Sequence, residues 1–510
     1  MTGIVRAHKR ILLIIIKKSL FRHLIWVRYT KGKFTLRGST NSQVAATSRA
    51  KSLYFLTWRW HFYAGLFVIP FILILSLTGL VMLFDDEIEQ VRYHDLLVVT
   101  PQSQQLAVSA QIDAVQQRFP DYAVTQFIPA PTENIANKVS IRSPEGTNLF
   151  ATVDPYSGQV LGTIDRSESW YSLANGIHAT LLIGDLGDYL IEIAASLGVL
   201  LLVTGLYLWW PRDNASKAGF LKLRVTQGTR VFMRDLHANL GGVLSIVLLF
   251  FLISGLSWTG IWGKSLVQAW NTFPTYYTWG EKPESTLTHA SLNHGNEEEM
   301  PWNLELAPMP ESNAAHDHSA MDMEMPEMSH GAISVDKIVT KAKELGFTQY
   351  RIYFPKGEKG VYTVAANTMA GDITDPRNDR TSHFDQYTGK LLVDVTWADY
   401  NLYAKAMAAG VSLHQGDLST LNKGLNVFFC IAFIAIAVTG VVMWWIRRPS
   451  GRAALGVPPR FASSGIWKTG LVTLILLAVL FPLGGLTIVT TLILDWLLFS
   501  RVEKLRLALR

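Results

Sequence analysis

Cysteine and nucleotide-binding motifs are nearly absent from this sequence. The chain has a single cysteine, Cys430, among 510 residues, so it can form neither an internal disulfide framework nor a metal site built from several thiolates. It also lacks a phosphate-binding loop after a strand, a dinucleotide fingerprint in a βαβ context and a recognisable flavin domain. We therefore expect neither ATP-driven transport nor direct oxidation of a nicotinamide cofactor.

Acidic residues are missing from the first 60 positions, which hold 13 lysines and arginines. Residues 211–236 hold six basic and two acidic residues, and 447–465 hold four basic and no acidic ones. Residues 85–187 hold five basic and 13 acidic residues. Because lysine and arginine mark the cytoplasmic side of membrane proteins, we expect the N-terminus and the two short loops to be cytoplasmic and the two long loops to be external.

Apolar runs of spanning length are what the sequence has in abundance. Hydrophobic residues make up 49% of the chain, and several runs reach the roughly 20 residues that cross a bilayer as a helix. We expect the following organisation: a basic cytoplasmic segment at 1–57, transmembrane helices at 58–84, 188–211, 237–263 and 421–446, external regions at 85–187 and 264–420, a cytoplasmic loop at 212–236, and a C-terminal transmembrane hairpin at 466–499.

Two of these segments have an alternative interpretation. In 466–499 the sequence Pro482-Leu483-Gly484-Gly485 interrupts a long apolar run, which favours a hairpin of two short spans over one long tilted helix. Within the N-terminal segment the apolar run Ile11–Ile16 is too short to span, and no small-residue cleavage site follows it. Residues 9–29 are either an amphipathic surface segment or part of a disordered basic tail.

The sequence pattern in each external region predicts a small α+β module. Helical spacing at 108–119 precedes strand-like stretches and the turn Asp154-Pro155-Tyr156-Ser157-Gly158, and helical spacing at 334–345 precedes strands and Asp385-Gln386-Tyr387-Thr388-Gly389. The polar composition of 281–330, between the third span and the second module, predicts disorder. The fold expected is an α-helical membrane protein in which a pair of transmembrane helices enclosing an α+β module occurs twice by tandem duplication, followed by the hairpin.

Two histidines open the outward helices with the same spacing. His61 and His237 are each followed by glycine four residues later. A hydroxyl-Gly-Leu triplet starts 17 residues after each of them, at Thr78 and Ser254. Seventeen helical residues rise about 26 Å, most of the thickness of a bilayer's hydrocarbon core, so each histidine is expected at the cytoplasmic end of its helix.

Two further histidines precede the inward helices. His178 lies 26 residues before Thr204, and His414 lies 25 residues before Thr439; each threonine is followed by glycine. A continuous helix from His178 to Thr204 would be about 39 Å long. These histidines therefore either stand above the membrane or are folded back by a break at the intervening glycines.

Histidines paired across a helix bundle are suited to bind haem. A neutral imidazole that ligates iron avoids the cost of a charge at membrane depth, and two facing imidazoles can occupy both axial positions. We predict two b haems, one held by His61 with His237 and one by His178 with His414, that together conduct electrons across the bilayer. For each histidine, anchoring at the level of the lipid headgroups is the alternative.

Two other groups of residues are candidates for cofactor or metal binding. Arg59 and Arg234 precede the inner histidines and could pair with haem propionates, or they are simply positive-inside residues. Thioether and imidazole side chains gathered in one loop suit copper(I). The copper candidates are His316, His318, Met321, Met323, Met325, Met328 and His330.

Taken together, residues 54–499 resemble the PepSY-associated transmembrane family of bacterial iron-regulated inner-membrane proteins, which includes ferric-siderophore reductases. The motifs that carry the resemblance are Arg59-Trp60-His61 with Gly65 and Thr78-Gly79, His178 with Gly184, Thr204-Gly205 with Trp209-Trp210, Leu236-His237 with Gly241, Leu413-His414 with Gly416, and Thr439-Gly440 with Trp444-Trp445.

The resemblance implies periplasmic PepSY modules, b-type haem and reduction of siderophore-bound ferric iron at the periplasmic face of the inner membrane. The electron donor would be membrane quinol or a cytoplasmic reductase. The basic N-terminal extension and the 281–330 insert depart from the family pattern, and the insert leaves open whether iron or copper is reduced. The alternatives are a non-enzymatic periplasmic metal-binding or transport protein and a cytochrome b subunit of another oxidoreductase.

Overall fold

The computed structural model describes residues 40–267, 285–294, 299–312, 333–448, 455–458, 468–494 and 497. The chain divides into two units, and the first, 1–52 with 462–465, contributes only the start of one helix to the described part. The second unit, 53–461 with 466–510, contains both the apolar helices and the β-sheet.

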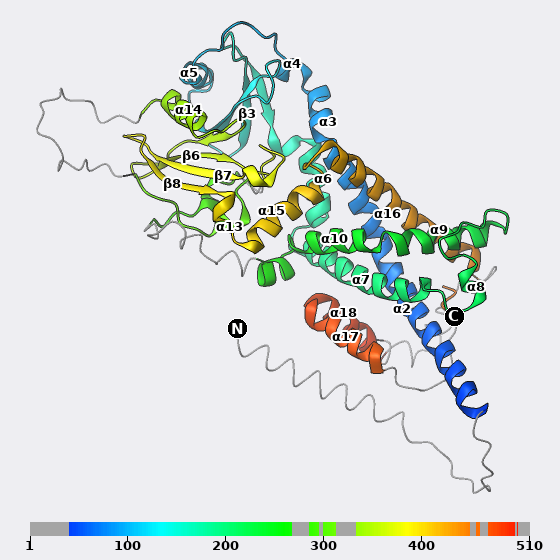
Figure 1. The fold of residues 1–510 in the computed structure, drawn as a ribbon. Helices are drawn as coiled ribbons and strands as arrows, with labels where there is room; N and C mark the ends of the chain where they lie inside the picture. Colours follow the sequence, from blue (N-terminus) through cyan, green and yellow to red (C-terminus); the bar gives the residue numbers. More distant parts are fainter. Residues whose placement is uncertain are drawn as a thin grey trace, which may run out of the picture. The chain divides into compact units, whose positions relative to one another are not determined.

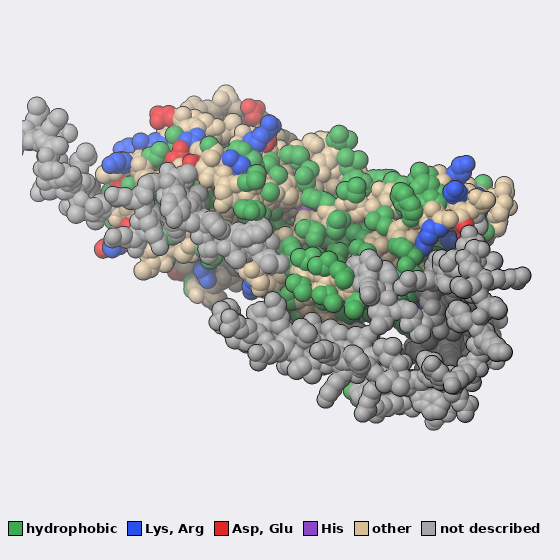
Figure 2. Space-filling view, turned by 60° about the horizontal axis from the view of Figure 1, so that its bottom comes forward, with side chains coloured by type: hydrophobic (Ala, Val, Ile, Leu, Met, Phe, Trp, Pro, Cys, Tyr) green, Lys and Arg blue, Asp and Glu red, His purple; other side chains and the backbone are tan. Residues whose placement is uncertain are grey.

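In the described part of the chain, three helices are long and apolar enough to cross a membrane: Leu53–Leu83 of α2 (Thr40–Leu83), α7 (Asp185–Trp209) and α16 (Thr420–Arg447). Their outward side chains are apolar, and Leu77 and Phe428 expose 54% and 52% of their surface. Hydrophobic side chains cover much of the helical part in Figure 2, and charged ones gather toward the two ends of the view. Such a surface is stable only against lipid, so this is a membrane protein.

The third expected span, 237–263, is not one straight helix. It consists of α9 (Thr229–Val243) and α10 (Ser245–Leu256), which meet at a bend of 62° and could cross together as one broken span. Gly242 lacks a side chain where the Trp209 ring packs, with the ring 2.3 Å from the position a Cβ would take. Ser245 donates its hydroxyl to the Gly242 carbonyl at 2.9 Å. Close packing at a glycine and a serine bonded to the preceding turn are common causes of a helix bend.

The C-terminal apolar run forms two short helices, α17 (Lys468–Leu480) and α18 (Pro482–Leu494), which contact each other and meet at Phe481. Trp262 stacks on the Phe481 ring at 6.1 Å. Thirteen residues of helix rise about 20 Å, less than the hydrocarbon thickness. Whether this pair crosses the membrane as a hairpin stays a prediction.

The two regions expected to be external contribute their strands to a single eight-stranded antiparallel sheet with the order β4-β3-β2-β1-β5-β6-β7-β8 (Figure 1). The halves join where β1 pairs with β5, with Gln126 opposite Tyr353 and Phe127 opposite Ile352. The sequence predicted two α+β modules but not that they share a sheet. The strands are β1 (Ala123–Ile128), β2 (Asn137–Arg142), β3 (Asn148–Val153), β4 (Val160–Asp165), β5 (Arg351–Tyr353), β6 (Val361–Ala366), β7 (Arg380–Asp385) and β8 (Leu391–Thr396).

One face of the sheet is covered by two helices, α5 (Val108–Arg118) and α14 (Val335–Glu344), one from each half (Figure 1). Val115 and Ile338 of these helices pack with Phe127, Val139 and other alternate strand residues in the main core. Alternation places the remaining strand residues on the opposite face, where η3 (His289–Leu292) and α13 (Trp302–Glu305) contribute to a second core.

The second core corrects one expectation, because the polar stretch 281–330 is not wholly disordered. Residues 285–294 and 299–312 are ordered against the sheet, and Met300 and Leu304 are completely buried there. A few apolar side chains suffice to dock an otherwise polar segment on a preformed sheet. The remainder of the stretch lies outside the described residues.

Each half of the sheet leads directly into a helix that carries a candidate histidine. After β4 the chain makes the short turn η1 (Arg166–Glu168) and enters α6 (Trp170–Thr180), and after β8 it makes η5 (Trp397–Asp399) and enters α15 (Leu402–Gln415). Two short helices, α3 (Asp85–Arg92) and α4 (His94–Leu97), connect α2 to the first half of the sheet. The sheet therefore lies at one end of the helices, here called the sheet side.

Candidate functional site

The structure brings His61 and His237 together. His61 lies on α2 and His237 on α9, and their ring centroids are 6.3 Å apart with the ring planes at 88°. These two residues form the inner pair, on the side of the helices away from the sheet. The partner that the repeat predicted for His61 is the one found beside it.

The structure also brings His178 and His414 together, as the outer pair on the sheet side. Their ring centroids are 6.5 Å apart and the ring planes meet at 89°. His178 is on α6, which ends in a left-handed turn at Leu181 and Leu182, and His414 is on α15, which ends at Gly416 with φ of +89°. At both places the chain reverses before it enters the next spanning helix. Of the two alternatives predicted from the sequence, both outer histidines are therefore folded back and do not lie on one continuous helix.

Every one of the four histidines is held through Nδ1 by a hydroxyl of another helix, a feature that the sequence reasoning missed. The contacts are His61 to Thr204 Oγ1 at 3.0 Å, His178 to Thr78 Oγ1 at 2.9 Å, His414 to Ser254 Oγ at 2.7 Å, and His237 to Thr439 Oγ1 at 3.3 Å together with the Ile436 carbonyl at 2.9 Å. The recurring hydroxyl–glycine motifs in the sequence were the signal that could have identified these partners.

The hydroxyl groups fix which ring nitrogen carries the proton. Each hydroxyl donates its only proton to the carbonyl four residues earlier, at 2.8 Å from Thr78, 2.7 Å from Thr204, 2.7 Å from Ser254 and 2.6 Å from Thr439. A hydroxyl has one proton to donate, and once the carbonyl receives it the hydroxyl accepts from the imidazole, which assigns Nδ1–H to each ring; at His237 the Ile436 carbonyl supports the same assignment, because a carbonyl can only accept. The lone pair of a neutral ring then lies on Nε2, and no described protein group hydrogen-bonds to Nε2 in any of the four.

A glycine beside each hydroxyl leaves room for the imidazole. A Cβ at Gly205 would lie 3.2 Å from Cε1 of His61, and one at Gly440 would lie 3.4 Å from Cε1 of His237. At Gly79 and Gly255 the corresponding distances to the outer rings are 3.8 and 4.0 Å. The hydroxyl–glycine motif is therefore one unit in which the hydroxyl holds the ring and the glycine accommodates it, most tightly at the inner pair.

The spacing within each pair fits a metal ion between two nitrogens. Metal–imidazole bonds of about 2 Å on both sides place ring centroids roughly 6 Å apart, as in both pairs. Direct hydrogen bonding brings rings closer, and the same protein shows this in His289 and His383, whose Nε2 atoms are 2.8 Å apart and whose centroids are 4.8 Å apart. The donor set, two neutral imidazoles with free Nε2 lone pairs inside an apolar bundle, fits axial ligation of haem.

Other kinds of metal centre find less support. Within the described ranges, no three His, Cys, Asp or Glu side chains converge as ligands for one metal ion. Axial ligation of haem needs only two protein ligands, because the macrocycle supplies the rest. The proposed copper ligands between 313 and 332 lie outside the described residues, so that site stays a prediction.

The two arginines proposed for propionate binding already have protein partners. Arg59 donates to the Tyr63 hydroxyl at 3.1 Å and to the Pro458 carbonyl. Arg234 pairs at 3.0 Å with Asp235, a carboxylate that is 2% exposed. Both arginines precede an inner histidine by two or three residues. Their role in holding a cofactor stays a prediction.

Carboxylates follow two of the helices on the sheet side: Asp85 begins α3 directly after α2, and Asp417 follows α15, three residues after His414. Burial and, second, the charge of Asp86 raise the pKa of Asp85 to about 7 and that of Asp417 to about 6. Beside them Lys423 pairs with Glu87 at 2.7 Å and joins α16 to α3. Two aspartates at this face can therefore carry protons near neutral pH.

Comparison with known proteins gives one family assignment. The sequence model of the PepSY-associated TM region matches residues 58–447, which include both histidine pairs, all four hydroxyl–glycine motifs and the whole sheet. No curated protein matches the chain. Because the match covers most of the sequence, the chain belongs to the PepSY-associated TM region family.

Proposed function

We propose that this protein is a di-haem reductase of the bacterial inner membrane that delivers electrons to chelated ferric iron, such as a ferric siderophore, on the periplasmic side. The observation that carries the proposal is the arrangement of the histidines. Two pairs lie at opposite ends of the apolar helices, with each Nδ1 fixed by a hydrogen bond and each Nε2 left free for a ligand.

Haem bound at these positions would supply reversible one-electron chemistry. His61 and His237 would hold one haem and His178 and His414 the other, and the four hydroxyl groups would orient the imidazoles. A group that hydrogen-bonds to a ligating histidine in this way raises the basicity of the imidazole and strengthens metal binding. No acid–base or nucleophilic side chain is needed, so we assign no catalytic residue beyond the ligands.

The two levels are connected by a shared helix. His61 and Thr78 lie on the same helix, 17 residues and about 26 Å apart along its axis. Between the levels the bundle is packed by an apolar cluster containing Leu240, Phe251 and Phe433, and the Phe251 ring lies 5.0 Å from that of His414. This packing keeps water and ions out of the region that electrons would cross.

The direction of transfer follows from charge. The basic N-terminal segment and short loops support a cytoplasmic location for the inner pair, and the acidic external regions support a periplasmic location for the sheet. Electrons would enter from quinol or from a cytoplasmic reductase. Reduction of the iron weakens a chelator's hold, because hard oxygen ligands bind the trivalent ion more tightly.

The proposal is tested by the reduced-minus-oxidised visible spectrum of the detergent-purified protein, with haem quantified per chain. We expect two low-spin b haems per chain and re-oxidation of the reduced protein by ferric siderophore alone. His237→Ala should lower the haem content to about one per chain while the sheet stays folded. A folded wild-type protein without haem would refute the proposal.

A further inference from the structure

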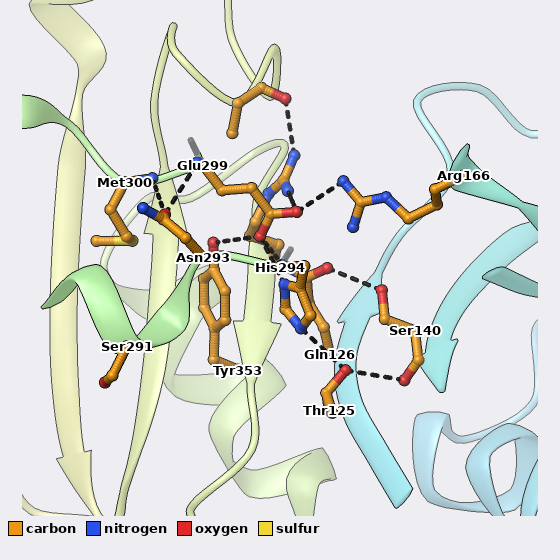
Figure 3. Close-up of polar contacts among 12 residues, drawn as sticks. Thr125, Gln126, Ser140, Arg166, Ser291, Asn293, His294, Glu299, Met300 and Tyr353 are labelled. Atoms are coloured by element: carbon orange, nitrogen blue, oxygen red, sulfur yellow. Dashed lines mark hydrogen bonds and ion pairs between the residues drawn. The ribbon is translucent and has the colours of Figure 1, made fainter. Parts of the chain in front are cut away.

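A buried carboxylate joins the two halves of the sheet to the segment that docks beneath them. Glu299 is 2% exposed and lies among residues of three different regions (Figure 3). Its oxygens contact Arg166 Nη2 at 2.8 Å, Arg351 Nη1 at 3.3 Å, His294 Nδ1 at 2.9 Å, Gln126 Nε2 at 3.1 Å and the Tyr353 hydroxyl at 3.2 Å.

These partners meet at the joint between the halves. Gln126 is on β1 and Tyr353 on β5, and these two residues face each other across the short β1–β5 pairing. Two residue pairs and one further backbone hydrogen bond, from the Phe354 amide to the Thr125 carbonyl at 3.0 Å, join β1 to β5, whereas six residue pairs join β2 to β3. The backbone alone therefore ties the halves weakly, and the side chains around Glu299 add hydrogen bonds and ion pairs to both strands.

From this joint, one path of contacts leads to His178. Arg166 opens the turn η1, and Ser169 at its end caps α6 by accepting a hydrogen bond from the Ser172 amide at 2.9 Å. The helix α6 carries His178. A displacement of Arg166 would therefore move the start of the helix that presents this histidine.

A second path leads to His414. Three residues after Glu299, Trp302 lies edge-on to Trp258 with 4.1 Å between ring centroids. Trp258 follows Ser254, whose hydroxyl holds His414, by four residues, one helical turn. Leu304 of the same segment packs in one cluster with Ala404 of α15, the helix that carries His414.

We propose that Glu299 is a positioning residue for the outer histidine pair: by pinning Arg166 and the β1–β5 joint, it fixes the placement of α6 relative to α15. The proposal rests on the haem-binding function proposed above. It also gives the ordered part of the 281–330 insert a role, because the insert supplies Glu299 and Trp302.

The charge of Glu299 ties Arg166 and Arg351 to the joint. The Arg166 side chain is 12% exposed and contacts Glu299 at 2.8 Å, and Arg351 pairs with both Glu299 and Asp372. Burial alone would favour protonation of Glu299, but the charges of Arg351 and Arg166 and the His294 hydrogen bond outweigh it and hold its pKa well below the ordinary value. Glutamine at this position therefore removes the charge that Arg166 Nη2 contacts at 2.8 Å, and weakens the tie between η1 and the β1–β5 joint.

The test uses the full-length, haem-loaded protein in detergent and low-temperature EPR of the ferric haems. The signal lost in His414→Ala identifies the outer site. Glu299→Gln and Arg166→Met should lower or broaden that signal at least severalfold and leave the inner signal intact, and Glu299→Asp should restore most of it. The matched control is Asp336→Asn, which removes a carboxylate that accepts from the Ser109 amide and joins the halves on the other face of the sheet; both signals should stay unchanged.

Unchanged outer signals in Glu299→Gln and Arg166→Met would overturn the proposal, and so would equal loss of both signals, which indicates a general effect on folding. If the wild-type protein contains no haem, the function proposed above fails, and hydrogen exchange then tests the positioning role separately. In that case Glu299→Gln should accelerate amide exchange in α6, relative to the wild type, and leave exchange in α14 unchanged. The same change in both helices, or no change in α6, would refute the positioning role.

Discussion

The hydroxyl that holds His61 offers the sharpest test of the histidine geometry. Thr204→Val replaces the hydroxyl with a methyl group of similar size, so the packing is largely conserved. The Nδ1–H of His61 then loses its 3.0 Å acceptor inside the bundle. An unsatisfied buried donor costs about 1–3 kcal/mol. Loss of the group that hydrogen-bonds to a metal-ligating histidine typically lowers metal affinity about 10- to 100-fold. The ring is also freed to rotate and to exchange its tautomer.

The assay is equilibrium titration of haem into protein prepared without it, followed by the visible spectrum and midpoint potential of the inner haem. We expect about tenfold weaker binding at the inner site and a higher potential, because a less basic imidazole stabilises the ferric state less. The control is Thr487→Val in α18, where the hydroxyl likewise donates to the carbonyl four residues earlier, at 2.9 Å, and hydrogen-bonds to none of the described histidines. Equal affinities and potentials in the two variants would refute the role assigned to the hydroxyl.

Three further outcomes are expected. Gly205→Ala places a methyl 3.2 Å from the His61 ring and should reduce inner haem content, whereas Gly241→Ala, with open space at its Cβ, should not; haem per chain distinguishes them. Asp85 has a raised pKa of about 7, so its contribution to stability is fully present below about pH 4 and is lost as pH rises through 7; melting temperatures at pH 4 and 8 should differ less in Asp85→Asn. His414→Ala should remove the outer haem alone, and an unchanged spectrum would contradict the outer assignment.

Spacing in the sequence predicted which histidines meet, because a helix converts residue separation into depth in the membrane. The separation of His61 from Thr78 and of His237 from Ser254 placed histidine and hydroxyl at opposite levels. It did not show that these hydroxyls face histidines, because the direction of a side chain around a helix depends on how the helices rotate against each other. The bend at Leu244 was also out of reach, since it depends on Trp209 packing against Gly242, a contact between separate helices.

The joint of the sheet and the role of Glu299 could not be read from the sequence for a different reason. Strand periodicity identifies which residues form strands, but an edge strand pairs with whichever edge the rest of the fold brings near it. Glu299 lies in a stretch whose composition predicts disorder. Its partners Arg166 and Arg351 lie on opposite sides of it in the chain, and the charge network exists only once β1 and β5 are adjacent.

The hydroxyl–histidine bonds and the histidine pairs divide differently between the two halves of the chain. Each hydroxyl–histidine bond stays within one half: Thr204 holds His61 and Thr78 holds His178 in the first, and Thr439 holds His237 and Ser254 holds His414 in the second. Each histidine pair, in contrast, is formed between the halves.

One half therefore presents a single fixed imidazole at each level. Under the function proposed above, each half would supply one of the two protein ligands of each haem, and the two halves together would complete both sets. Because α2, like the pair α9–α10, contributes a histidine at one level and a hydroxyl at the other, a shift of either along its axis disturbs both levels together. The β1–β5 joint and Glu299 act instead on α6 and α15, which carry only the outer histidines, so their loss should be felt at the outer pair and not at the inner one.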